Sequence, residues 1–161
     1  MDLNMLGLAI AILGGALAVG LAGSGSAIGV ALAGSAASGL IAEDPEKFGA
    51  TLLLVALPGT QGIYGFLTGF LVIMKLGLLS ATVIKPSLFQ GIQIFGACMP
   101  IAIAGFISAV HQGKVCAAGI GVAAKKPEAA MKALVYGALV ETYAILGLVM
   151  SIFFLQGIKL Q

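Results

Sequence analysis

The chain opens on LNMLGLAIAILGGALAVGLAGSGSAIGVALAGSAASGLIA at residues 3–42, a run that contains no Asp, Glu, Lys or Arg. Residues 48–74 and 86–113 also lack these four residue types, and residues 133–160 contain only Glu141 and Lys159. A helix needs about 20 mostly apolar residues to cross a bilayer. The sequence therefore predicts four membrane-spanning helices, near residues 4–42, 48–76, 87–124 and 129–158.

The composition excludes the common water-soluble classes. Of 161 residues, 60% are hydrophobic and only 9% are charged, whereas a soluble domain carries about 25% charged residues. The net charge is only +2 and arginine is absent, which argues against a nucleic-acid partner. A membrane β-barrel would alternate apolar and polar residues in short segments, and long unbroken apolar runs contradict that pattern. We therefore predict an all-α membrane protein.

The sequence also contains an internal duplication. When Pro45-Glu46 is placed on Pro127-Glu128, Thr60 falls on Thr142 in the same register. The chain thus reads as two tandem helical hairpins in the same orientation, residues 1–80 and 81–161, which is a parallel repeat. The informative mismatch is that Gly59 of the first hairpin takes the place of Glu141 in the second.

Glu141 is the candidate functional residue because it stands in mid-span. A charge near the bilayer centre costs several kcal/mol or more, so such residues are rare and usually functional. The carboxyl group must be protonated, paired with a cation or hydrogen-bonded. The alternative interpretation is a protonated Glu that only holds helices together.

A polar cluster in the second span offers partners for that carboxylate. The segment Leu57-Pro58-Gly59-Thr60-Gln61-Gly62-Ile63-Tyr64 places one carbonyl, one hydroxyl, one amide and one phenol on a single helix face. Pro58 lacks an N–H and disturbs the helix, so the Leu57 carbonyl is a candidate ligand. Each group alone is typical of helix–helix hydrogen bonds, but together they indicate a cation site.

Gln112 of the third span reaches the same depth. Counted from the turns at Pro45 and Pro127, Gln61, Gln112 and Glu141 all lie about 21–24 Å along their helices. Oxygen ligands suit a hard cation, and a single carboxylate is neutralised by one monovalent ion. A proton needs only the carboxylate, so the additional oxygens favour Na+ over H+. We expect the Tyr64 phenol to bond the carboxylate and hold the site closed.

The positions of Glu141, Thr60 and Gln61 on their helices also predict that copies of the chain form a homo-oligomer. In the repeat, Glu141 and the Thr60/Gln61 group occupy different faces of equivalent helices. When two such helices lie side by side, the face of one that carries Glu141 meets the face of the other that carries Thr60 and Gln61. Repetition of this head-to-tail contact closes into a homo-oligomeric ring. Small residues such as Gly25 and Gly29 favour close helix packing in its wall.

These motifs resemble the 16-kDa proteolipid, or rotor-ring subunit, of V-type ATPases, and most of all the bacterial Na+-translocating type. Segments that carry the resemblance, over nearly the whole chain, are residues 45–49, 57–65, 112–115 and 140–147. It implies a Na+ carrier with Glu141 as the essential residue, with ligands at Leu57, Thr60, Gln61 and Gln112, and with Tyr64 as the gating residue. The chain would be a subunit of an ATP-driven pump and no enzyme by itself.

The resemblance further implies the partners and the location. The ring would turn in lipid against a stator subunit that carries a basic residue, and its cytoplasmic loops would dock on a central stalk. Lysines are more frequent near the turns at 43–47 and 125–128 than at the other end, which predicts cytoplasmic turns and external termini in a bacterial plasma membrane. Two alternatives remain: a proteolipid that carries H+, and a channel or structural four-helix membrane protein.

Overall fold

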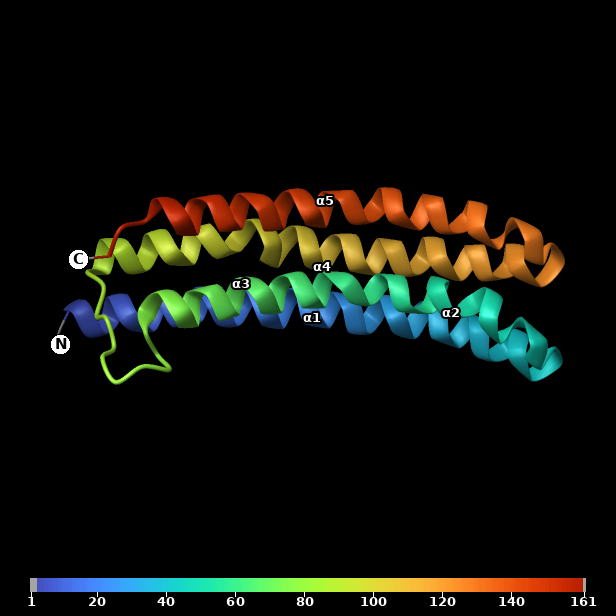
Figure 1. Cartoon of the computed structure of the whole chain (residues 1–161), viewed down its shortest axis with the longest axis horizontal. Helices are drawn as coiled ribbons and strands as arrows, with labels where there is room; N and C mark the ends of the chain where they lie inside the picture. Colours follow the sequence, from blue (N-terminus) through green and yellow to red (C-terminus); the bar gives the residue numbers. More distant parts are fainter. Residues whose placement is uncertain (1–2, 161) are drawn as a thin grey trace.

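The computed structural model describes residues 3–160, which fold into long helices joined by short turns (Figure 1). The helices are α1 (Leu3–Glu43), α2 (Phe48–Ala56), α3 (Thr60–Leu76), α4 (Leu88–Lys125) and α5 (Ala130–Gly157). Single 3-10 turns precede α2, α3 and α5, at Pro45–Lys47, Leu57–Gly59 and Pro127–Ala129. Within residues 3–160, four helical segments of 41, 32, 38 and 31 residues are long and apolar enough to cross a membrane, which confirms the four predicted spans.

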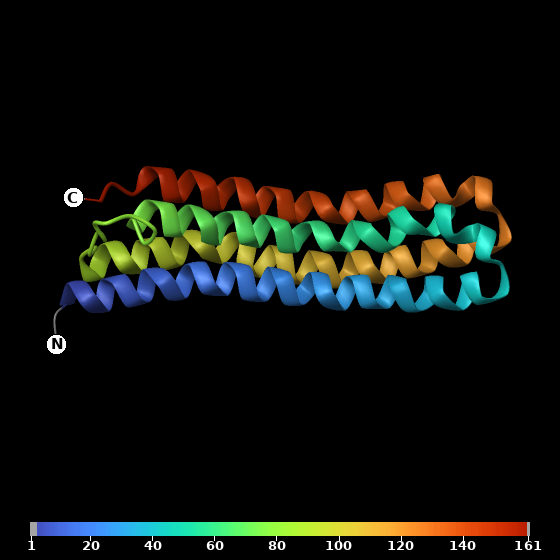
Figure 2. The ribbon, with the colours of Figure 1, turned by 60° about the horizontal axis from the view of Figure 1, so that its bottom comes forward.

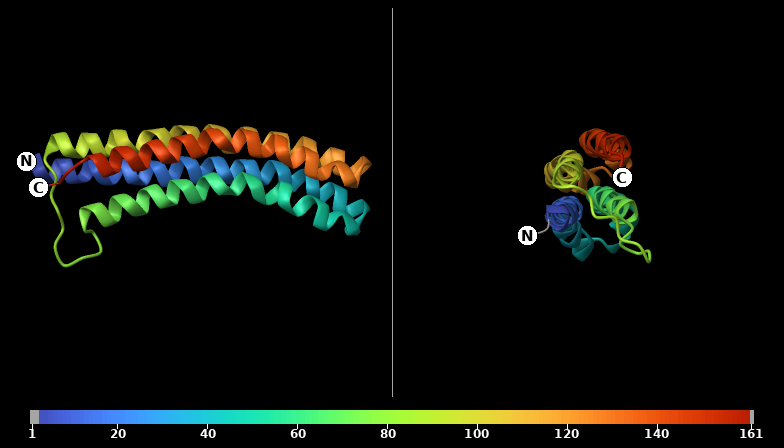
Figure 3. Two further views of the ribbon diagram at one scale, coloured as in Figure 1. Left: turned by 45° about the horizontal axis from the view of Figure 1, so that its top comes forward. Right: turned by 90° about the vertical axis from the view of Figure 1, so that its left-hand side faces the viewer.

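The four segments lie alongside one another as a bundle with both chain ends on one side (Figures 1 and 2). The connection between α3 and α4 lies at that same end, and the two short turns with Pro45 and Pro127 lie at the other. Seen end-on, α1 and α4 occupy one side of the bundle, and α3 and α5 occupy the other (Figure 3). Each hairpin therefore contributes one helix to each side.

Local sequence signals explain where the helices begin and end. Asp44 accepts a hydrogen bond from the Glu46 N–H at 3.2 Å and so caps the first turn. Gly77 ends α3 with a φ of 66°, a left-handed conformation that glycine adopts without a Cβ penalty. Ser87 and Gln90 form a capping box that starts α4.

Glycines set the close approach of α1 to α4. A Cβ on Gly14 would lie 2.6 Å from the Phe95 Cα, and a Cβ on Gly25 would lie 2.6 Å from the Phe106 carbonyl oxygen. No side chain fits between these backbones. Packing of this kind is typical of membrane helices, in which small residues let backbones come together.

The packing inside the first hairpin repeats inside the second. A Cβ on Gly65 would lie 2.6 Å from the Ala22 Cβ, and a Cβ on Gly147 would lie 2.9 Å from the Ala104 Cβ. In the register that places Pro45 on Pro127, Gly65 falls on Gly147 and Ala22 falls on Ala104. The internal repeat read from the sequence therefore corresponds to a repeated helix–helix contact.

Candidate functional site

The second span changes its helix type where the polar cluster begins. Leu57–Gly59 forms one turn of 3-10 helix between α2 and α3, because Pro58 cannot donate a backbone hydrogen bond. The Leu57 carbonyl accepts the Thr60 N–H and also the Thr60 hydroxyl, the latter at 3.0 Å. The predicted disturbance of the helix at Pro58 is confirmed, and the Leu57 carbonyl is in contact with the Thr60 hydroxyl.

Glu141 of α5 is 8% exposed and is held by two other spans. The Tyr64 hydroxyl of α3 donates to Glu141 Oε1 at 2.6 Å. The Gln112 amide of α4 donates to Glu141 Oε2 through Nε2 at 3.4 Å. Within the segment 57–64, Tyr64 contacts the carboxyl group directly, so Glu141 points toward this segment as the sequence predicts.

Two fully buried glutamines link the rest of the cluster. Gln61 Nε2 donates to Gln112 Oε1 at 2.5 Å, and Gln112 Nε2 also donates to the Gly137 carbonyl at 2.9 Å. The Thr60 hydroxyl lies 3.3 Å from Gln61 Oε1, which is an alternative acceptor to the Leu57 carbonyl for its single hydrogen. The structure thus brings the Leu57 carbonyl together with the side chains of the other predicted site residues, which are Thr60, Gln61, Tyr64, Gln112 and Glu141.

The structure adds two serines that sequence reasoning missed. Ser108 accepts from Gln61 Nε2 at 3.3 Å and donates to the Val140 carbonyl at 2.9 Å. Ser26 accepts from the Gly62 N–H at 2.8 Å. Ser108 lies one helical turn before Gln112, so the two share a helix face, and that spacing was the available signal. For Ser26 the sequence gives no comparable signal, since its partner is a backbone N–H of another helix.

The Glu face and the Thr/Gln face meet inside one chain. Glu141 on α5 and Tyr64 on α3 belong to neighbouring spans of the same molecule (Figure 3). The predicted meeting of these two faces is therefore found between α3 of the first hairpin and α5 of the second hairpin of one chain.

The chemistry of the site is that of one carboxylate among neutral oxygen and nitrogen groups. Within residues 3–160, no cluster of three or more His, Cys, Asp or Glu side chains is placed to hold a metal ion. Every buried side-chain nitrogen or oxygen in that range has a hydrogen-bond partner. The donor set therefore does not suit a transition metal, which prefers imidazole or thiolate ligands.

Two helical hairpins in tandem, with one buried carboxylate in mid-span, define the class of small membrane proteolipids that assemble into rings. The sequence pattern of the ATP synthase C-subunit family matches the chain twice, at residues 13–72 and 95–154. The chain belongs to this family. In the register that places Pro45 on Pro127, residue 13 falls on residue 95 and residue 72 falls on residue 154. The two family matches therefore coincide with the two copies of the internal repeat.

Two relatives agree with this assignment. The chain is 48% identical over 145 residues to the V-type sodium ATPase subunit K of Enterococcus hirae, which covers 90% of this chain and 89% of that protein. It is 38% identical over 121 residues to the A-type ATP synthase subunit K of Methanocaldococcus jannaschii, which covers 75% of this chain and 50% of that protein. The chain is accordingly a ring-forming membrane subunit of an ATPase complex, and it does not catalyse ATP hydrolysis itself.

Proposed function

We propose that each copy of the chain carries one Na+ across the membrane on Glu141, coupled to ATP hydrolysis in a separate soluble sector. The observation that carries the proposal is the burial of Glu141 beside the oxygen-rich segment at residues 57–64. The similarity to a sodium ATPase subunit supports the choice of ion.

The ligands in this proposal are the Glu141 carboxylate, the Leu57 carbonyl and the side-chain oxygens of Thr60, Gln61 and Gln112. Gln112 directs its amide nitrogen toward Glu141, so its amide must turn over to offer the oxygen to a cation. One carboxylate neutralises one monovalent ion, whereas a divalent ion would leave a net charge in the membrane at a cost of several kcal/mol. Five oxygens suit Na+, a hard cation.

The transport cycle follows from electrostatics. With Na+ bound, the site is neutral and crosses the lipid-facing part of the rotation. A fixed basic residue on the stator competes with Na+ for Glu141, so the ion leaves on one side and the emptied site refills from the other. Tyr64 holds the carboxylate in place between these events through its 2.6 Å hydrogen bond.

The proposal also assigns the orientation. The turns at Pro45–Lys47 and Pro127–Ala129 lie at the same end of the bundle. Five of the eight lysines lie in or next to these turns or in the adjoining halves of α4 and α5, namely Lys47, Lys114, Lys125, Lys126 and Lys132. This end therefore faces the cytoplasm of a bacterial cell. There the turns contact the central stalk. The chain ends face outward, and the ring turns in the lipid of the plasma membrane.

A carbodiimide labelling experiment tests this function. Dicyclohexylcarbodiimide reacts with a protonated carboxyl group, so we expect it to modify Glu141 in the assembled complex. Because Na+ and a proton compete for the same carboxylate, added NaCl slows the labelling at constant pH, and KCl at equal ionic strength does not. Equal labelling rates in NaCl and KCl would contradict Na+ binding and favour the H+-carrying alternative.

The Tyr64→Phe variant is expected to weaken Na+ binding. It removes the hydroxyl that donates to Glu141, and a hydrogen bond to a charged group contributes about 1.5–3 kcal/mol, which corresponds to a roughly 10- to 100-fold change in affinity. The measurement is the Na+ concentration that halves the rate of carbodiimide labelling. Tyr143→Phe, an exposed position on α5, is the matched control, and equal Na+ requirements in both variants would exclude a gating role for Tyr64.

A further inference from the structure

Two backbone carbonyls of α5 fix the direction of two hydrogen bonds that come from α4. Gln112 Nε2 donates to the Gly137 carbonyl at 2.9 Å, and the Ser108 hydroxyl donates to the Val140 carbonyl, also at 2.9 Å. A backbone carbonyl can only accept a hydrogen bond. The nitrogen of the Gln112 amide is therefore held toward α5, and both the Gln112 oxygen and the Ser108 oxygen are left as acceptors.

Gln61 of α3 meets both of these acceptors with the same nitrogen. Its Nε2 donates to Gln112 Oε1 at 2.5 Å and to Ser108 Oγ at 3.3 Å. An amide nitrogen has two hydrogens, so both are used. If the Gln61 amide were turned over, its oxygen would face two other acceptors. Gln61 Oε1 therefore points away from them, toward the Thr60 hydroxyl at 3.3 Å.

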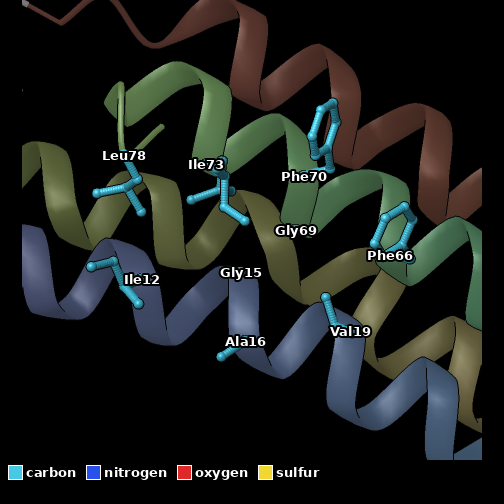
Figure 4. A pocket seen from close by; sticks show the side chains of 10 residues that line it. Ile12, Gly15, Ala16, Val19, Phe66, Gly69, Phe70, Ile73 and Leu78 are labelled. Carbon is cyan, nitrogen blue, oxygen red and sulfur yellow. The ribbon is translucent and has the colours of Figure 1, made fainter. Parts of the chain in front are cut away.

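Burial makes these acceptors hard to replace. Gln61 and Gln112 are both 0% exposed, and Ser108 is 5% exposed. A pocket of about 340 Å³ lies between α1 and α3 from Phe66 onward, little more than one turn after Gln61, and apolar residues line it (Figure 4). An amide N–H that loses its acceptor at this depth is left without compensation, which costs free energy.

Na+ binding alters this network at Gln112. In the proposed function, the Gln112 amide turns over and gives its oxygen to the cation. That oxygen then no longer accepts from Gln61 Nε2. Of the two acceptors that hold the Gln61 amide, Ser108 is the one that remains in the ion-bound state.

We propose that Ser108 is a positioning residue for Na+, a role that rests on the proposed function of the chain as a Na+ carrier. Ser108 accepts from Gln61 Nε2 and so keeps Gln61 Oε1 directed at the cation while Gln112 turns. It does not touch the ion. The Val140 carbonyl orients Ser108 in turn, because it takes the single hydroxyl hydrogen.

A second buried serine provides a matched control. Ser151 of α5 is 0% exposed and accepts from the Ile101 N–H of α4 at 3.2 Å. Ser108 and Ser151 thus both join α4 to α5 through a backbone group. Ser151 lies ten residues after Glu141, about 15 Å along the helix. Its loss therefore weakens the same pair of helices at a distance from the ion site.

Carbodiimide labelling of Glu141 in the assembled complex tests the role of Ser108. The unmodified chain, Ser108→Ala and Ser151→Ala are labelled over a series of NaCl concentrations at constant pH, and over a series of pH values without Na+. Mass spectrometry of the peptide that contains Glu141 gives the labelled fraction. The two series separate the affinity for Na+ from the protonation of the carboxyl group.

Ser108→Ala is expected to need roughly 10-fold more Na+ for half protection, which corresponds to about 1.4 kcal/mol. In the empty site Gln61 Nε2 keeps Gln112 as an acceptor, whereas in the ion-bound site it keeps none. The pH of half-maximal labelling without Na+ stays unchanged, because the bonds from Tyr64 and Gln112 to Glu141 remain. Ser151→Ala is expected to change neither value.

The outcomes separate this role from the proposed function. If Na+ protects the unmodified chain and Ser108→Ala equally, or if both alanine variants shift alike, Ser108 does not position the site. A shift of the pH profile in Ser108→Ala would indicate a general disturbance of the site and would also overturn the role. If Na+ does not protect the unmodified chain, the proposed function fails, and the role of Ser108 fails with it.

Ser108→Cys extends the test to a variant that keeps the packing. A thiol is close in size to a hydroxyl, but its sulfur is a weak acceptor. We expect a normal yield of SDS-resistant ring from this variant, together with a Na+ requirement that is raised as in Ser108→Ala. A Na+ requirement equal to that of the unmodified chain would contradict the proposal, even if Ser108→Ala does not assemble.

Discussion

The Glu141→Gln variant is expected to assemble into a ring but to lose ATP-driven Na+ transport. Glutamine keeps the size of the side chain, its amide oxygen accepts from Gln112, and its amide nitrogen donates to the Tyr64 hydroxyl oxygen, so the site remains packed. It removes the negative charge, however, and a cation at this depth then lacks a counter-charge. A penalty of about 3 kcal/mol for a charge in the membrane corresponds to roughly 100-fold weaker ion binding.

The measurement is ATP-dependent uptake of radioactive sodium by proteoliposomes that contain the whole complex. Tyr143→Phe is the control, because Tyr143 is an exposed residue on the same helix, away from the turns that contact the stalk. We expect the control to transport at the normal rate. Normal transport by Glu141→Gln would contradict the carrier role and return the chain to the channel or structural alternative.

The Gly25→Leu variant is expected to prevent accumulation of the folded ring. A Cβ at this position would lie 2.6 Å from the carbonyl oxygen and 2.7 Å from the Cα of Phe106, so α1 and α4 must separate along their contact. Backbone atoms cannot rotate away as a side chain can, and overpacking commonly costs about 1–3 kcal/mol or more. The amount of SDS-resistant ring in the membrane measures the effect.

Gly39→Leu, on the same helix, is the control for this change. No atom lies within 4 Å of a Cβ on Gly39, and leucine favours a helix over glycine by up to about 1 kcal/mol. We therefore expect normal or higher ring yield from this control. A normal yield of Gly25→Leu ring would show that the close α1–α4 contact does not hold the bundle together.

The spans and the hairpin repeat could be predicted because each rests on a signal within the chain. Apolar runs free of charge are required of any helix that crosses a membrane, so the four spans follow from composition alone. The shared depth of Gln61, Gln112 and Glu141 follows from counting residues from two turns, since the helix rise is constant. The hydrogen bonds from Gln61 to Gln112 and from Gln112 to Glu141 confirm that count.

Other features could not be predicted because they depend on how helices rotate against one another. The backbone bond from Gly62 to Ser26 and the direction of the Gln112 amide are set by neighbouring spans. The repeat indicates which faces are equivalent, but it does not say which of two equivalent faces is packed. That difference appears only in the structure, where Ile94 is buried and Ile12 is open.

The most direct test of the central claim is a density map of the isolated ring in buffer with Na+ and in buffer without it. We expect a spherical peak between the Glu141 carboxylate, the Leu57 carbonyl and the Thr60 hydroxyl, present only with Na+, and a Gln112 amide turned toward that peak. Identical maps, with Glu141 bonded only to Tyr64 and no peak beside it, would contradict Na+ binding at this carboxylate.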